Sequence, residues 1–132
     1  MECLPVKSEK EQLQFAALAI NFSYLEYEDP GAFSTSRPGL LYGNPNGRIF
    51  IWNPYLESRE AVSLSIILKI SIKYDPTENI VSADWCQQGE EKIEIRATYF
   101  DDDSALVAFR KVIVDVAAEI GRRIQLKNTN RN

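Results

Sequence analysis

The sequence of 132 residues contains no histidine. This absence excludes Ser-His and Cys-His nucleophilic pairs, imidazole acid-base catalysis, and histidine ligation of zinc or haem. The two cysteines, Cys3 and Cys86, lie far apart in the sequence and cannot form a four-thiolate site or a Cys-x-x-Cys redox pair. Neither of the common glycine-rich phosphate-binding motifs is present. We therefore expect no cofactor and no metal.

The sequence also lacks an apolar run of the about 18 residues that a membrane-spanning helix requires. The start of the chain, MECLPVKSEKE, has neither the basic residues nor the apolar block of a secretory signal peptide. We expect a cytoplasmic protein with reduced thiols and no membrane segment. Basic residues are fewer than acidic ones, 15 against 19, and the net charge of −4 disfavours nucleic acid as a partner.

The composition itself is that of an ordinary globular protein. Hydrophobic residues make up 45% of the chain and charged residues 26%. The length suits one domain with its own core. We expect a single domain over residues 1–132, with frayed ends at 1–7 and 127–132.

The most regular local pattern lies between Ala61 and Tyr74. Apolar residues occupy every second position, and serine and lysine occupy most positions between them. The apolar set is Val62, Leu64, Ile66, Leu68, Ile70, Ile72 and Tyr74. A period of two predicts a strand with one aliphatic face, which the terminal helices would cover.

Two helices are predicted near the ends of the chain. Ser8 and Glu11 have the spacing of a capping box, so a helix should begin at Glu9 and continue to Ile20. Residues 21–28 fit a helix or a strand. Asp101-Asp102-Asp103-Ser104 opens a long final helix, whose apolar arc is wider than one sheet contact requires. Either the first helix or a second subunit should cover the remainder of that arc.

Several further strands are expected. Asn46-Gly47 between two apolar runs predicts a hairpin over residues 40–53, after an irregular loop at 29–39. Short polar turns join the strand at 61–74 to segments 80–87 and 92–100, which makes them an antiparallel meander. The predicted fold is α+β, with an antiparallel meander sheet of four to five strands. An N-terminal helix and a long C-terminal amphipathic helix would pack on one face of this sheet.

Four aromatic residues are candidates for binding a partner protein: Phe50, Trp52, Tyr55 and Trp85. Large aromatic side chains at strand ends are common contact anchors, although they also fill protein cores. Residues beside the turn at Asn53-Pro54 are difficult to bury completely. This position favours Trp52 and Tyr55 as contact residues.

Carboxylates supply the remaining candidate chemistry. Asp84 lies in an otherwise apolar strand, where desolvation would raise its pKa and suit it to act as a general base. Its simpler interpretation is an aspartate that faces outward near the strand end. The cluster Asp101–Asp103 offers oxygen ligands for a hard cation, but its position at a helix start favours N-capping.

These observations favour a non-enzymatic protein-interaction module that binds a protein partner or itself as a homodimer. In size, acidity and helix-sheet-helix composition the chain is similar to small bacterial chaperones and adaptors such as type III secretion chaperones, although its expected element order differs and no residue role is taken from them. One alternative is a carrier of an apolar small molecule, held between the sheet and the helices. The other is a carboxylate-dependent enzyme that uses Asp84 or Asp101–Asp103.

Overall fold

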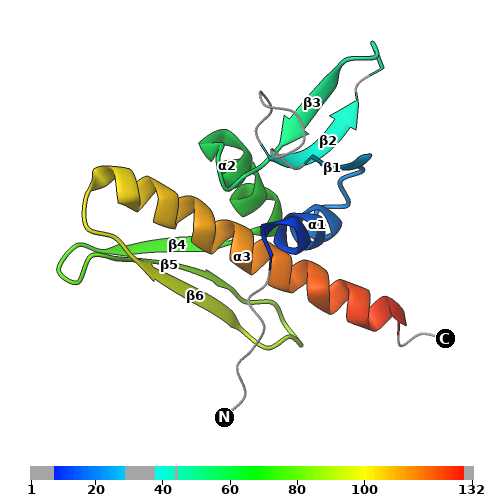
Figure 1. The fold of residues 1–132 in the computed structure, drawn as a ribbon. Coiled ribbons are helices and arrows are strands. Elements are labelled where there is room, and N and C mark those ends of the chain that lie inside the picture. The colour runs from blue at the N-terminus through cyan, green and yellow to red at the C-terminus, as the bar shows by residue number, and fades with distance from the viewer. Residues whose placement is uncertain (1–7, 29–37, 44, 130–132) are drawn as a thin grey trace.

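In the computed structural model, which describes residues 8–28, 38–43 and 45–129, the helices lie between two antiparallel sheets (Figure 1). Sheet A has the strand order β1-β2-β3 and sheet B has the order β4-β5-β6. The elements in chain order are α1 (Glu9–Ala19), β1 (Glu26–Glu28), β2 (Gly39–Gly43), β3 (Ile49–Trp52), α2 (Ser58–Leu68), β4 (Ser71–Asp75), β5 (Ile80–Trp85), β6 (Ile93–Thr98) and α3 (Asp102–Thr129). The predicted α+β class is confirmed. The single sheet of four to five strands is wrong, because the described strands form two sheets of three.

The long helix α3 runs through the middle of the molecule, with sheet B on one side and α1 and α2 on the other (Figure 1). Side chains around much of its circumference are therefore buried, as at Val112, Val114 and Ala117. The wide apolar arc is explained within one chain, because the first helix packs beside the last. Helix α3 continues to Thr129, so residues 127–129, which were expected to belong to a frayed end, are part of this helix. Residues 1–7 and 130–132 lie outside the described residues.

The start of α1 follows the sequence pattern closely. The hydroxyl oxygen of Ser8 accepts a hydrogen bond of 3.1 Å from the backbone N–H of Glu11, as expected for a helix cap. The helix ends at Ala19. Within the segment 21–28, for which helix and strand were both open, residues 26–28 form strand β1. The predicted loop at 29–39 falls mostly on residues that are not described.

The prediction for residues 61–74 is wrong over most of its length. Helix α2 occupies residues 58–68, and only Ser71–Asp75 is a strand. Lys69 ends the helix in the left-handed conformation, with φ 58°. The backbone N–H of Ile70 then donates to the carbonyl oxygen of Ser65, which closes the last helical turn.

The sequence is compatible with a helix because some of the alternating apolar residues also have helical spacing. Ala61 and Leu64 are three positions apart, Leu68 follows four positions later, and this spacing places them on one helix face. Ala61 and Leu64 are fully buried, whereas Val62 and Ile66 are exposed. The aliphatic residues of the expected strand face are thus divided between the two sides of a helix.

Because α2 stands between β3 and β4, the chain leaves one sheet before it begins the other. The hairpin at 40–53 is confirmed, with Tyr42 opposite Phe50 in an antiparallel register. It joins β1 in sheet A, however, and does not extend the meander as expected. The meander is reduced to β4, β5 and β6, which form sheet B.

Sheet B has one dry face and one wet face. Val81, Ala83 and Trp85 of β5 share the side that packs against α3, and Ile93, Ile95 and Ala97 of β6 are paired beside them. Glu94, Arg96 and Thr98 alternate with these residues and are more exposed. The sequence pattern of β5 and β6 is confirmed. Within the described ranges, no helix combines the length and the apolar character of a membrane span.

Candidate functional site

The first candidate surface is the outer side of α2, here named the α2 face and made of Val62, Ile66 and Ile67. These side chains are 38%, 68% and 57% exposed. The opposite side of the helix is already packed, with Ala61 and Leu64 in the core. The α2 face is therefore an aliphatic surface on which Ile66 and Ile67 are mostly exposed and Val62 is partly exposed.

Positive charge lies near both ends of the α2 face. Arg59 precedes Val62 by three positions and Ile66 by seven, so it shares their side of the helix. Lys69 follows at the C-terminal end, and both side chains are exposed. Glu60, the acidic residue of the helix, instead accepts a hydrogen bond of 2.7 Å from the backbone N–H of Asn53. The local charge is opposite in sign to the net charge of −4.

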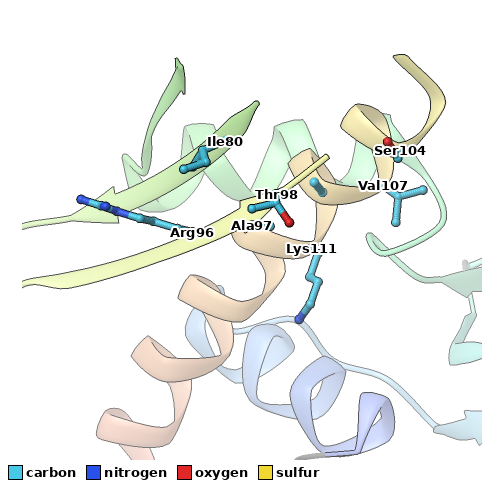
Figure 2. Close-up of a pocket in the computed structure, with 8 residues that line it drawn as sticks. Ile80, Arg96, Ala97, Thr98, Ser104, Val107 and Lys111 are labelled. Atoms are coloured by element: carbon cyan, nitrogen blue, oxygen red, sulfur yellow. The ribbon is translucent and has the colours of Figure 1, made fainter. Parts of the chain in front are cut away.

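The second candidate is an open cleft between β6 and α3, here named the β6 cleft. Its larger part has a volume of about 970 Å³ and is bounded by β6, α3, the start of α1 and the Tyr55-Leu56 segment. A smaller part of about 600 Å³ lies between the end of β6 and the first turns of α3. Val107 and Lys111 line both parts, so the two parts adjoin at these residues. Figure 2 shows the smaller part, where Ala97 and Thr98 lie beside α3.

A polar network built on Asp115 lines the larger part of the cleft. The Tyr55 hydroxyl donates to Asp115 Oδ1 at 2.6 Å, and the Gln12 amide donates to the same oxygen at 3.2 Å. Lys111 Nζ lies 2.7 Å from Asp115 Oδ2. The Asp115 side chain is only 13% exposed. Burial, together with the negative charge of Asp115, raises the pKa of the Tyr55 phenol above its ordinary value.

The main chain around Tyr55 is also held in place. Arg110 Nε donates to the carbonyl oxygen of Tyr55 at 2.7 Å, and its Nη1 donates to the Ser58 hydroxyl at 3.0 Å. The Asn53 side chain accepts a hydrogen bond from the backbone N–H of Tyr55. These contacts attach the segment before α2 to α3. They explain how Tyr55 reaches Asp115 from a turn far away in the sequence.

The four aromatic candidates from the sequence occupy different environments. Trp52 and Trp85 belong to the core and are 6% and 9% exposed. Phe50 is 40% exposed on sheet A, where its ring stacks on Tyr42 with centroids 5.5 Å apart. Tyr55 is partly buried in the β6 cleft. The structure does not bring the four side chains together as one surface.

The carboxylate candidates Asp84 and Asp101 each have a structural partner. Asp84 lies on the face of sheet B that points away from α3, 3.9 Å from the ammonium group of Lys73, and its side chain is only 15% exposed. Asp101 accepts a hydrogen bond of 2.7 Å from the backbone N–H of Ser104, and this bond lowers the pKa of Asp101. Asp102 and Asp103 stand in the first turn of α3, where the helix dipole favours negative charge. No group of three acidic or cysteine side chains with metal-binding geometry occurs in the described ranges.

Sequence reasoning missed the most connected polar residue. Asp115 lies in the predicted final helix with no local sign of burial, but the structure leaves its side chain only 13% exposed. The one local indication was Lys111, four residues before it, because a residue pair at this spacing forms ion pairs on helices. Nothing in the sequence connected Asp115 with Tyr55 or Gln12. The sequence pattern does not indicate the α2 face, because the predicted strand places Val62 and Ile66 on its buried aliphatic face.

No protein-family model matches the chain, and neither the curated proteins nor the solved structures contain a significant match. Its function is therefore argued from its own residues.

Proposed function

We propose that this chain is a non-enzymatic protein-interaction module that binds a partner protein through the α2 face. The supporting observation is the exposure of Val62, Ile66 and Ile67 on a helix whose other side is already packed. Complete burial of a fully exposed aliphatic side chain contributes about 1.5–3 kcal/mol. These side chains are 38% to 68% exposed, so a partner that covers them gains a part of that amount from each.

The charges beside the α2 face favour a particular kind of partner. Arg59 and Lys69 place positive charge near both ends of the aliphatic surface. A partner segment with aliphatic anchors flanked by acidic residues complements this arrangement. Two copies of the chain packed with α2 against α2 would bring like charges together, although a homodimer remains the second candidate for the covering partner.

The carrier and enzyme alternatives have weaker support among the described residues. The space between sheet B and α3 is filled by fully buried side chains such as Val81, Ala83 and Val116. The clefts that do occur are open at the surface. Asp84 and Asp101 serve an ion pair and a helix cap. None of these features favours a ligand or a reaction as directly as the α2 face favours a protein partner.

Selection from a displayed library of helical peptides tests the proposal. The native chain is the target, and the double variant Ile66→Ser/Ile67→Ser is used for counter-selection. Because both side chains are mostly exposed, this variant should keep its unfolding free energy within about 1 kcal/mol of the native value. We expect the recovered peptides to carry aliphatic residues at helical spacing with acidic flanks.

The matched control is Leu126→Ser, which removes an exposed aliphatic side chain near the C-terminal end of α3. Recovered peptides should bind this control as tightly as the native chain. Peptides that bind all three proteins equally, or that carry basic flanks, would contradict the proposal. Sedimentation equilibrium of the native chain shows in addition whether it dimerises, and loss of a dimer in Ile66→Ser/Ile67→Ser would place the second copy on the α2 face.

A further inference from the structure

A third cleft lies against α1 and is here named the α1-α3 pocket. It has a volume of about 590 Å³ and is bounded by α1, the turn that follows α1, and the last turns of α3. Small-molecule sites usually have volumes of about 300–1,000 Å³. Figure 1 shows that the last turns of α3 continue beyond α1. None of the described residues that line this pocket lines the β6 cleft or belongs to the α2 face.

One wall of the pocket begins at the contact between α3 and α1. Gly121 lies so close to the main chain of Phe15 that a Cβ atom would not fit between them. Gln125 and Asn128 follow Gly121 by four and seven positions, so they lie on the same side of α3. Both residues are exposed and line the pocket. The helix contact therefore places two amide residues of α3 opposite α1.

The turn after α1 contributes to the other wall. The backbone N–H of Phe22 donates to the carbonyl oxygen of Ala17 at 2.8 Å. The N–H of Asn21 donates to the carbonyl oxygen of Leu18 at 3.1 Å. Together these bonds end the helix in a Schellman motif, with Asn21 in the left-handed conformation at φ 55°. Glycine is the usual residue at this position because it has no Cβ atom, whereas Asn21 adds an amide side chain to the pocket.

Four side-chain amides line the pocket in total. They belong to Gln14, Asn21, Gln125 and Asn128. None of these side chains makes a hydrogen bond with another residue of the described ranges. Gln12 of the same helix α1 differs, because its amide donates to Asp115. Each amide presents donors and an acceptor side by side, and in this pocket they remain available to a ligand.

The remaining lining is mostly apolar and aromatic. It comprises Phe15, Leu18, Phe22 and Tyr24. Glu11 is the charged residue of the described lining, which contains no lysine or arginine. A phosphate would therefore find no cation and would be repelled by Glu11. An apolar ligand would displace water from the amides without replacing its hydrogen bonds. The pocket suits a neutral ligand that combines many hydrogen-bonding groups with apolar surface.

We propose that the α1-α3 pocket binds a neutral saccharide. A pyranose ring carries hydroxyl groups around its rim, each both donor and acceptor, and C–H groups on its two faces. The hydroxyl groups pair with the amides of both walls, and the C–H faces pack on the aromatic residues. A nucleobase has fewer polar groups, each fixed as donor or acceptor, so it would satisfy fewer of the amides. This site is separate from the α2 face, and the proposal does not depend on a protein partner there.

Saturation-transfer NMR titration of the native chain with cellobiose, maltose and lactose tests the proposal. Glucose 6-phosphate is the control for an anionic sugar, and adenosine is the control for a flat neutral base. We expect at least one disaccharide to bind saturably with a Kd of about 1 mM or lower, and both controls to bind at least about tenfold more weakly. Absence of saturable binding by all three disaccharides would overturn the proposal. Equal or tighter binding of either control would also overturn it.

The variant Asn21→Gly separates binding from folding. Glycine adopts the left-handed backbone readily, so the thermal midpoint should stay within about 4 °C of the native value. The variant removes one amide from the pocket and should weaken binding of the best disaccharide by about fivefold. An unchanged affinity would contradict the proposed contact between this amide and the saccharide.

A double variant tests the α3 wall. Gln125→Ala/Asn128→Ala removes two exposed amides, and the helix should persist because alanine is the best helix former. We expect binding of the best disaccharide to weaken by about tenfold or more. The matched control Gln87→Ala/Gln88→Ala removes two exposed amides between β5 and β6 and should bind within about twofold of the native chain. Equal affinities of the two double variants would show that the saccharide does not bind in the α1-α3 pocket.

Discussion

Asp115 connects three segments that are distant in the sequence: α1 through Gln12, the segment before α2 through Tyr55, and its own helix through Lys111. A buried carboxylate is costly unless hydrogen bonds and charges compensate it. Here the Tyr55 hydroxyl, the Gln12 amide and the Lys111 ammonium group compensate the Asp115 carboxylate. The network is therefore both a stabilising contact and a wall of the β6 cleft.

Removal of the Asp115 carboxylate should destabilise the protein more than removal of its exposed partner. In Asp115→Ala the Tyr55 hydroxyl and the Gln12 amide lose their common acceptor, at a cost of about 1–3 kcal/mol in unfolding free energy. Lys111→Ala breaks a pair whose lysine is 58% exposed, and it should cost less than about 1 kcal/mol. Urea denaturation of both variants gives the comparison. Equal losses would contradict the assigned role of the network.

The Tyr55 phenol should make stability depend on pH above about 10, its ordinary pKa. Because burial raises its pKa in the folded protein, the folded state holds the phenol proton more tightly than the unfolded chain does. The contribution of the protonated Tyr55 phenol to the unfolding free energy is complete below pH 10. It is lost as the pH rises above that value, by up to about 1.4 kcal/mol per pH unit. Tyr55→Phe should remove this part of the slope. Denaturation of both proteins from pH 7 to about 11.5 tests this expectation. If the difference between their unfolding free energies stays the same across this pH range, the expectation is contradicted.

At the scale of elements, the packing of α1 against α3 depends on one small residue. A Cβ atom at Gly121 would lie 1.8 Å from the carbonyl oxygen of Phe15, a backbone atom that cannot move without displacing α1. The two helices therefore approach more closely at Gly121 than any other residue type allows. This contact holds α1 at the side of the β6 cleft.

Gly121→Ala should separate these helices and cost about 1–3 kcal/mol in unfolding free energy, although alanine is intrinsically the better helix former. Gly43→Ala is the matched control, because the nearest atom to its added Cβ is the Arg48 carbonyl oxygen at an ordinary 3.7 Å. Thermal denaturation compares the two variants. Stabilisation by Gly121→Ala would show that the close approach of the helices does not persist in solution.

Helix α2 shows how one segment satisfies two periods. The apolar positions between Ala61 and Tyr74 alternate, but Ala61, Leu64 and Leu68 also lie on one helical face. The choice between the two depends on whether a strand or a helix better fits the surface that α3 presents. That surface does not exist until distant parts of the chain have packed.

For the whole molecule, the distribution of burial predicts unequal local stability. The core is concentrated where α3 meets α1 and sheet B, with Val112, Ile113 and Val116 fully buried. Sheet A contributes fewer buried side chains, chiefly Leu40 and Trp52. The far end of its hairpin, near Ile49, is exposed.

Amide hydrogen exchange should follow this distribution. Backbone amides of α3 between Val112 and Ile120, and of β5, should exchange only through global unfolding. Amides of β2 and β3 near Gly43 and Ile49 should exchange through smaller local openings and at higher rates. Mass spectrometry of exchanged peptides distinguishes the two regions. Equal protection across both would show that sheet A and the centre unfold as one unit.

Several features were determined by the sequence alone, because neighbouring residues are sufficient to specify them. They include the cap at Ser8, the hairpin around Asn46-Gly47, the alternating faces of β5 and β6, and the long amphipathic final helix. In each case a short-range period or a turn residue allows one local structure. The α+β class follows from them.

Only the tertiary structure decided the rest. It made residues 58–68 a helix, divided the strands between two sheets, buried Trp52 and Trp85, and joined Asp115 to Tyr55 and Gln12. These outcomes depend on contacts between segments far apart in the chain, and a local pattern that suits both helix and strand contains no information about them. The physical reason is that burial is a property of the packed molecule, so which aliphatic residues remain exposed is settled only when the other elements are in place.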